Sequence, residues 1–186
     1  MYLKWFDRWL KGVDNKILDE PLVRVFVMFS NQWLTGDTYP LPQTRFTKLY
    51  LGSGRGANTS RGDGLLSWDA PAGGKECDTY LYDPGDPTPL PDWDYKRDAQ
   101  IRQDKKKAID LKEEKDRQAA FHTSVTDQRQ DILVYQTAPL DKPVTSAGPV
   151  SAVIHAASSA VDTDWFVTLM DVDEQGTVHA IYQRGV

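Results

Sequence analysis

The sequence predicts an all-β antiparallel fold, a sandwich or jelly roll, with a short N-terminal helix and one charged inserted helix. Three observations lead to this prediction. Short runs of β-branched and aromatic residues recur along the chain, turns rich in Pro and Gly separate them, and helical patterns do not alternate with them. The length of 186 residues suits one well-packed domain.

The first element is an amphipathic helix over residues 2–12. Tyr2, Phe6 and Trp9 recur at helical spacing, charged side chains occupy the opposite side, and Gly12 marks the end of the helix. A helix this short is marginal in isolation. Its aromatic face therefore needs a partner surface, provided either by the rest of this chain or by a preceding domain.

The expected strands follow in order after the helix. The run that follows Pro21, residues 22–28, is rich in Val and Phe and predicts the first strand. By the same criteria we expect further strands over 47–52, 65–68, 78–83, 131–137, 149–156, 164–173 and 178–183. The runs over 149–156 and 164–173 are expected to pair across a polar turn.

One segment, about 94–118, departs from the strand pattern because it is densely charged with both signs interspersed. Glu113 and Arg117 form a favourable i,i+4 pair, worth ~0.2–0.5 kcal/mol on a helix. The apolar stripe is narrow, so we expect a solvated helix lying over the sandwich. Acidic residues offset the basic ones, which argues against a nucleic-acid-binding helix.

Composition disfavours several classes of function. The net charge of −5 is typical of neither a nucleic-acid-binding nor an anionic-membrane-binding protein. No apolar run approaches the ~18 residues of a membrane span. The single cysteine, Cys77, precludes an intrachain disulfide, and the three histidines show no metal-ligand spacing. We expect no metal and no cofactor.

A cluster of Ser, His and Asp near residue 160 suggests a hydrolase triad. Its members are His155, Ser158, Ser159, Asp162 and Asp164. A catalytic serine needs a base within hydrogen-bond reach and a sharp turn such as G-x-S-x-G, and that pattern occurs nowhere in the chain. We interpret the cluster as a structural turn between two strands, with Asp162 and Asp164 bonding loop backbone. Two acids alone are a weak signal for calcium.

The glycine-rich run over 51–64 suggests a phosphate cradle, which requires a helix to follow. A strand-like run follows instead, so we predict a surface loop, and we treat the Arg-Gly-Asp tripeptide at 61–63 as coincidental. Trp93 and Tyr95 follow a Pro-rich loop and are candidates for the wall of a substrate pocket, although core or interface packing is the alternative for any of the six tryptophans.

Several blocks together resemble one known family. WFDRWLKGVDN with LDEPLVRVFVM, YLGSGRGANTSRGDGLLSWDAP with DTYLYDPGDPTP, and the long run from 131 to 176 are similar to the C-terminal part of X-Pro dipeptidyl-peptidase and cocaine-esterase-like (CocE/NonD) serine hydrolases. The resemblance implies a galactose-binding-like jelly roll that packs against an α/β-hydrolase domain. That domain carries the family's Ser-Asp-His triad, so no catalytic residue is expected in this chain.

The resemblance also implies a division of the chain. Residues 1–20 would be the junction of an α/β-hydrolase domain, and residues 21–186 the β-sandwich, incomplete at its C-terminus. Missing strands would expose an edge and favour self-association. The leading hypothesis is a non-catalytic domain that braces a hydrolase domain and shapes its acyl pocket. The alternatives are a free-standing carbohydrate- or protein-binding module and a homo-oligomerisation domain.

Overall fold

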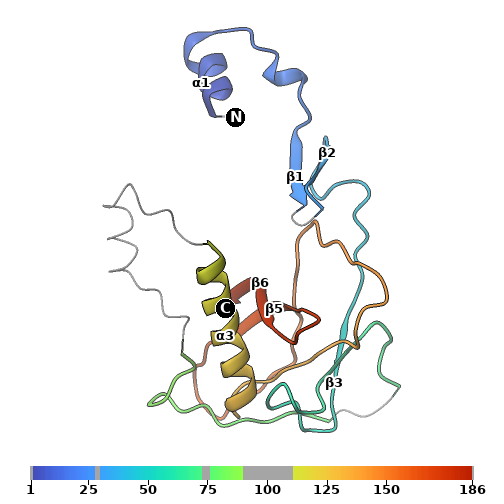
Figure 1. The fold of residues 1–186 in the computed structure, drawn as a ribbon, viewed down its shortest axis with the longest axis vertical. Helices are drawn as coiled ribbons and strands as arrows, with labels where there is room; N and C mark the ends of the chain where they lie inside the picture. Colours follow the sequence, from blue (N-terminus) through green and yellow to red (C-terminus); the bar gives the residue numbers. More distant parts are fainter. Residues whose placement is uncertain (1, 28–29, 73–75, 90–110, 186) are drawn as a thin grey trace. The chain divides into compact units, whose positions relative to one another are not determined.

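The computed structural model describes residues 2–27, 30–72, 76–89 and 111–185. Contacts divide the chain into two compact units, one of residues 1–47 and 140–153 and the other of residues 48–139 and 154–186. Figure 1 labels most of the elements, which in chain order are α1 (Tyr2–Lys11), the 3-10 helix η1 (Ile17–Asp19), β1 (Val23–Val27), β2 (Gln32–Gly36), β3 (Tyr50–Gly52), β4 (Leu65–Ser67), α3 (Leu111–Gln128), β5 (Phe166–Val172) and β6 (Val178–Gly185).

Helix α1 confirms the predicted N-terminal helix. Gly12 adopts a left-handed conformation with φ of 70°, and the Val13 amide donates to the Asp7 carbonyl oxygen at 3.0 Å. A left-handed glycine directly after the last helical residue is a common way of ending a helix, and the Val13 bond returns the chain towards the helix. Lys11 pairs with Asp7 one turn earlier at 2.6 Å, so local interactions fix both the end of the helix and its last turn.

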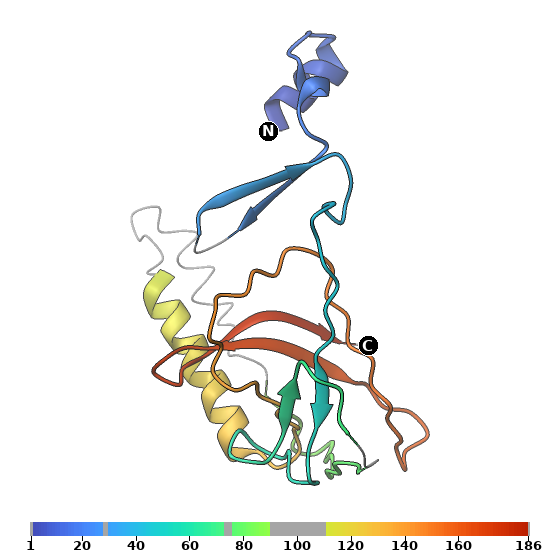
Figure 2. The same cartoon turned by 90° about the vertical axis from the view of Figure 1, so that its right-hand side faces the viewer.

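Strands β1 and β2 form an antiparallel hairpin in the first unit (Figure 2). Strand β1 confirms the prediction for the run after Pro21. Strand β2 was not predicted because only Trp33 and Thr35 in it are strong strand formers. Phe26 and Trp33 are directly opposite each other in the register, which places both rings on one face of the hairpin.

Strands β3 and β4 form a second antiparallel pair, which belongs to the second unit. The expected strand over 131–137 is an extended segment that makes only isolated bridges, from Leu133 to Asn58 and from Gln136 to Leu65. The prediction of a regular strand there was wrong because its backbone bonds go to the glycine-rich loop: the amides of Val134 and Gln136 donate to Ala57 and Gly64.

Two further expected strands are also irregular. The run over 78–83 has no ladder, because Asp78 is fastened through its side chain to the glycine-rich loop instead. The run over 149–156 is exposed and adopts no regular structure among the described residues. The described residues therefore form a β-rich fold, with small antiparallel sheets and two α-helices, and the jelly-roll arrangement remains a prediction.

Strands β5 and β6 form the longest hairpin among the described residues and confirm the last two predicted strands. The turn between them is held by Asp173, whose carboxylate accepts the amides of Gln175 and Thr177 at 3.0 and 2.8 Å. Gly176 adopts the left-handed φ of 80° that this tight turn requires. His179 on β6 reaches back to the other oxygen of Asp173 at 3.1 Å, which ties the turn to the strand.

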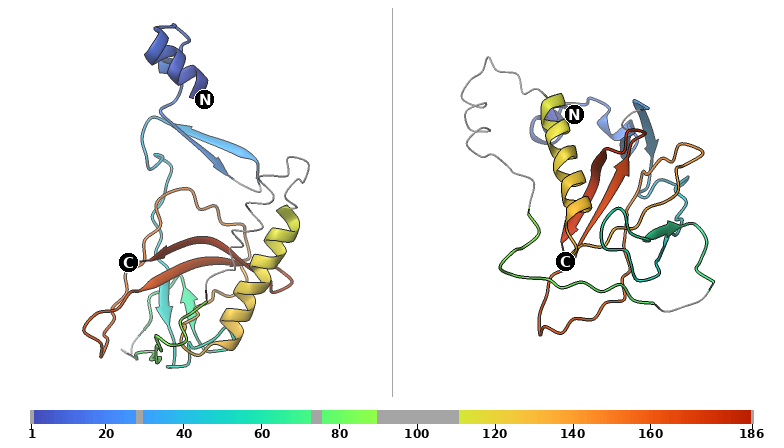
Figure 3. Two further views of the ribbon diagram at one scale, coloured as in Figure 1. Left: turned by 90° about the vertical axis from the view of Figure 1, so that its left-hand side faces the viewer. Right: turned by 60° about the horizontal axis from the view of Figure 1, so that its bottom comes forward.

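Helix α3 lies beside β6 in the second unit, as both views of Figure 3 show. The predicted helix began near 94, and residues 90–110 lie outside the described part of the chain. Its predicted end near 118 was wrong, because the helix continues to Gln128. Ala119, His122 and Thr126 recur at helical spacing and are buried. The helix is thus packed on one side and not merely solvated, with the hydroxyl of Thr123 accepting the Val178 amide at 3.4 Å.

Buried apolar side chains are few in the described residues: Leu41 in the first unit and Ala57, Ala119 and Val178 in the second. Large apolar side chains are instead widely exposed, including most of those on α1. Contiguous exposed apolar surface marks sites of association. No helix in the described part of the chain has the length and apolar character to cross a bilayer.

Gly64 is expected to be sensitive to substitution. A Cβ at Gly64 would overlap the carbonyl oxygen of Val134, whereas a Cβ at Gly52 would meet nothing within 4 Å. Overpacking of this kind costs ~1–3 kcal/mol. We expect Gly64→Ala to lower the free energy of unfolding in urea by about that amount, and Gly52→Ala to leave it nearly unchanged. Equal stability of the two variants would contradict the close approach of the two segments.

Candidate docking surface

The Ser, His and Asp cluster near residue 160 lies in an exposed segment of irregular backbone. The Ser158 hydroxyl accepts the Ala160 amide at 3.0 Å, which is the behaviour of a turn residue. Among the described residues, no hydrogen bond joins Ser158 or Ser159 to the imidazole of His155. The structure therefore does not bring the cluster together as a nucleophile and its base.

Trp93 and Tyr95, the candidate pocket-wall residues, lie outside the described residues, and their role stays a prediction. Cys77 is exposed. Within the ranges that the structure describes, no group of three or more His, Cys, Asp or Glu side chains is placed to hold a metal ion.

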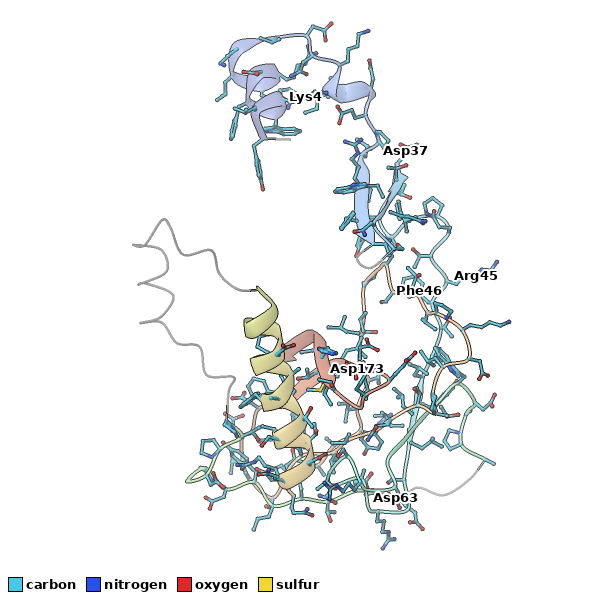
Figure 4. The ribbon with its side chains drawn as sticks, viewed as in Figure 1. Lys4, Asp37, Arg45, Phe46, Asp63 and Asp173 are labelled. Atoms are coloured by element: carbon cyan, nitrogen blue, oxygen red, sulfur yellow. The ribbon has the colours of Figure 1, made fainter. Side chains whose placement is uncertain are left out.

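The glycine-rich loop of the second unit is organised around the carboxylate of Asp63 (Figure 4). One oxygen accepts the Gly54 amide and the other accepts the Gly56 amide, both at 2.9 Å. These are the amides that a phosphate cradle would offer to its ligand. The carboxylate of the chain's own Asp63 occupies them, so the loop behaves as a structural turn.

The same bonds explain the Arg-Gly-Asp tripeptide. Both oxygens of Asp63 are engaged within the loop, and Arg61 reaches the carboxylate of Asp127 on α3 at 3.4 Å. The carboxylate of the tripeptide is therefore occupied within the loop, which fits the interpretation of the tripeptide as coincidental, although the Arg61 side chain is 81% exposed.

Asp78 is a second carboxylate that organises this region. It accepts the hydroxyls of Ser53 and Tyr135 at 2.5 and 2.7 Å and the amide of Ala57 at 3.1 Å. Burial opposes its ionisation, but the hydrogen bonds from Ser53, Tyr135 and Ala57 outweigh burial and hold the pKa of Asp78 below its ordinary value. Burial and the bond to Asp78 raise the pKa of Tyr135. One side chain thus joins three segments that are distant in sequence.

One exposed apolar surface in the first unit lies on α1. We define the aromatic stripe as Tyr2, Trp5, Phe6 and Trp9, which recur at the i, i+3, i+4 and i+7 spacing of one helix face. None of the four is buried: the exposed fractions of Trp5 and Trp9 are 51% and 57%. The rings of these two tryptophans lie 5.6 Å apart, tilted by 52°, and form a continuous aromatic surface.

The polar side of α1 is occupied by the chain itself. Lys4 pairs with Glu20 at 2.7 Å, and Arg8 pairs with Asp14 at 3.3 Å. The segment after the helix thus folds back along its charged side and leaves the aromatic stripe exposed. A helix with its polar side satisfied and its aromatic side open is suited to binding an apolar surface.

Phe26 and Trp33 form a second exposed aromatic group, on the β1–β2 hairpin. Their rings lie 5.0 Å apart with planes tilted by 49°, and their exposed fractions are 42% and 62%. Sequence reasoning missed this pair because β2 was not predicted. It also missed the contacts of Asp78 with Ser53 and Tyr135, and that of Glu20 with Lys4, because these partners lie too far away in sequence for a periodic signal to reveal them.

Comparison with known proteins finds one matching family and several longer relatives. Residues 15–186 match the family described as the X-Pro dipeptidyl-peptidase C-terminal non-catalytic domain. The chain is 38% identical over 181 residues to a cocaine esterase of Rhodococcus sp. (strain MB1 Bresler), covering 97% of this chain and 29% of that protein.

Two mycobacterial proteins are also similar. The putative serine esterases Mb1866c of Mycobacterium bovis and MT1883 of Mycobacterium tuberculosis are each 30% identical to the chain over 179 residues, covering 95% of this chain and 24% of theirs. The chain therefore spans less than a third of the length of these relatives.

The hydrogen bonds to Asp78 predict a pH dependence of stability. Because the folded-state pKa of Asp78 is depressed, its contribution is present above the unfolded-state pKa of about 3.9 and is lost as pH falls through the lower folded-state value. We expect Asp78→Asn to have a lower free energy of unfolding than the unsubstituted chain at pH 7. The difference in free energy between the two proteins should become smaller at acidic pH. The measurement is urea unfolding of both proteins at a series of pH values. A constant difference at every pH would show that ionisation of Asp78 contributes nothing.

Proposed function

The chain belongs to the family of X-Pro dipeptidyl-peptidase C-terminal non-catalytic domains, and from this premise we propose that it is the β-domain of a serine hydrolase that braces the catalytic domain and shapes its acyl pocket. The relatives named above are esterases of more than three times the matched length. In this proposal the parent protein cleaves ester or amide bonds through an acyl-enzyme, and its triad lies in the part that this chain does not match.

The aromatic stripe on α1 is the observation that carries the proposal. Burying four aromatic side chains against a partner would remove a large apolar area from water, and each such side chain contributes 150–250 Å² of surface, as an order of magnitude. The charged side of the helix already has partners within the chain. A hydrolase domain in the same polypeptide would supply the missing surface at high effective concentration.

Two finer parts of the proposal concern architecture and the pocket. We propose that the small antiparallel sheets belong to a jelly roll, which the family resemblance supports. We also propose that the loop over 84–95, with Trp93 and Tyr95, forms one wall of the acyl pocket. Aromatic side chains next to a Pro-rich loop are suited to lining an apolar cleft.

A second candidate function is sugar binding by a free-standing module, and the exposed Phe26 and Trp33 pair favours it. Aromatic rings on an exposed hairpin can stack on apolar faces of sugars. The tilt of 49° between these two rings argues against it, because they do not present one flat platform. Saturable heat release on titration with mono- and disaccharides, abolished by Trp33→Ala, would favour the module over the hydrolase domain.

The docking proposal predicts that the stripe is the main binding determinant. The probe is the hydrolase domain of the parent polypeptide, recognised by a G-x-S-x-G motif and produced separately. We expect Trp5→Ser and Trp9→Ser each to weaken its binding about 30-fold or more, since central aromatic side chains of an interface cost ~2 kcal/mol or more when truncated. Isothermal titration calorimetry measures the affinity.

Phe46→Ser is the matched control for the docking experiment. Phe46 is an aromatic residue of the same unit that lies outside the stripe and is 74% exposed, more than Trp5 or Trp9. We therefore expect its loss to leave the affinity within a few-fold of that of the unsubstituted chain. Light scattering at several concentrations separates docking from self-association. A parent polypeptide without a hydrolase domain, or binding that is unaffected by both tryptophan substitutions, would sink the proposal.

The proposal also predicts that the purified 186-residue chain does not hydrolyse nitrophenyl esters. Any slow background hydrolysis should persist after treatment with a serine-directed phosphonate, since no serine in the chain is expected to act as a nucleophile. Turnover that the phosphonate abolishes would place a catalytic serine in this chain, and Ser158→Ala and Ser159→Ala would then identify it.

A further inference from the structure

Glu20 connects helix α1 with the β1–β2 hairpin that follows it. Its carboxylate oxygens contact two different cations: Oε1 lies 2.7 Å from Nζ of Lys4, and Oε2 lies 3.1 Å from Nη1 of Arg24. Lys4 belongs to α1 and Arg24 to β1, and all three residues are in the first unit. One side chain is therefore shared between the two elements.

The first half of the intervening segment is fixed by its own contacts. Gly12 ends α1 with a left-handed turn, and the Val13 amide is bonded to Asp7 on the helix. Asp14 then pairs with Arg8 at 3.3 Å, which holds the chain against the polar side of α1. The chain is thus returned along the helix directly after leaving it.

The second half of the segment is fixed by Asn15. Its side-chain amide donates to the Lys4 carbonyl oxygen at 2.6 Å, and its side-chain oxygen accepts the Ile17 amide at 3.2 Å. Lys16 takes a left-handed φ of 57°, and the Glu20 amide donates to the Ile17 carbonyl at 3.3 Å. These bonds form the short helix η1, which contacts α1.

A flexible linker has a different character. Flexible linkers are rich in Gly and Ser and lack defined contacts with the elements they join. The segment over 12–20 contains one glycine and no serine, and bonds to α1 recur along it. The Lys4 hydrogen bond also holds the pKa of Glu20 below its ordinary value, so the carboxylate is charged at neutral pH.

We propose that residues 12–20 form a fixed elbow that sets the orientation of the aromatic stripe relative to the β1–β2 hairpin, with Glu20 as the positioning residue. A partner bound to the stripe would then be held at a defined angle to the hairpin. This consequence rests on the proposed function, whereas the elbow itself is a property of the chain alone.

A substitution at Glu20 tests the elbow more severely than one at either cation. A single exposed ion pair contributes little. Glu20→Gln removes the charge from both pairs at once, while it keeps the size of the side chain and leaves the stripe intact. Arg24→Gln breaks only the contact with β1 and cannot perturb the helix from within.

The experiment measures residual dipolar couplings of backbone amides in the weakly aligned 186-residue chain. In the unsubstituted chain we expect the couplings of α1 and those of the hairpin to fit one common alignment tensor. In Glu20→Gln we expect the couplings of α1 to shrink about two-fold or more relative to those of the hairpin, with a smaller effect in Arg24→Gln. Amide chemical shifts confirm that α1 remains helical.

Two controls make the test specific. Asp19→Asn removes a neighbouring carboxylate that forms no ion pair with the described residues, and we expect it to leave the couplings unchanged. The triple reversal Lys4→Glu, Glu20→Lys, Arg24→Glu recreates both pairs with opposite signs, and we expect it to restore the common tensor.

Two outcomes would overturn the inference. Couplings of α1 that are already much smaller than those of the hairpin in the unsubstituted chain would show that the elbow is not fixed. Unchanged couplings in both Glu20→Gln and Arg24→Gln would show that Glu20 does not position the helix. Neither outcome depends on a hydrolase domain, because none is present in the experiment. Failure of the docking proposal would instead appear in the tryptophan variants, which keep Glu20.

Discussion

The scarcity of buried apolar side chains determines how the segments of this chain are held together. With so few of them in the described residues, most large apolar groups lie at the surface, and polar interactions hold the segments together. Carboxylates do this repeatedly: Asp63 and Asp78 fasten the glycine-rich loop, Asp173 closes the last hairpin, and Glu20 connects α1 with β1. Such interactions define geometry well but add little stability in exposed positions.

This constraint supports the proposal that the chain docks onto a larger partner surface. A protein that buries little of its own apolar surface gains most from an external surface that covers the rest. The aromatic stripe is the clearest place for such cover, because the polar side of α1 is already satisfied within the chain. Family membership and the partial coverage of longer relatives are consistent with the same proposal.

Sequence reasoning succeeded where a local signal dominates. Helix α1 and strands β1, β5 and β6 have clear periodicity and turn chemistry. It failed where distant partners decide the structure: the run over 78–83 has the alternation of a strand, yet Asp78 bonds to Ser53 and Tyr135 instead. The end of α3 was misplaced because the charged run stops near 118, while the packed positions Ala119 and His122 lie beyond it. The exposed stripe was recognised as needing a partner, but the elbow was not, because no pattern links Lys4 with Glu20.

The shared carboxylate of Glu20 has a consequence for exchanging domains between relatives. The boundary predicted from the family resemblance, after residue 20, separates Glu20 from Arg24, although the two are bonded. A chimera joined at that boundary would combine Glu20 from one relative with the residue at position 24 from another. Crossovers placed after Arg24 would carry Lys4, Glu20 and Arg24 together and preserve their charge complementarity.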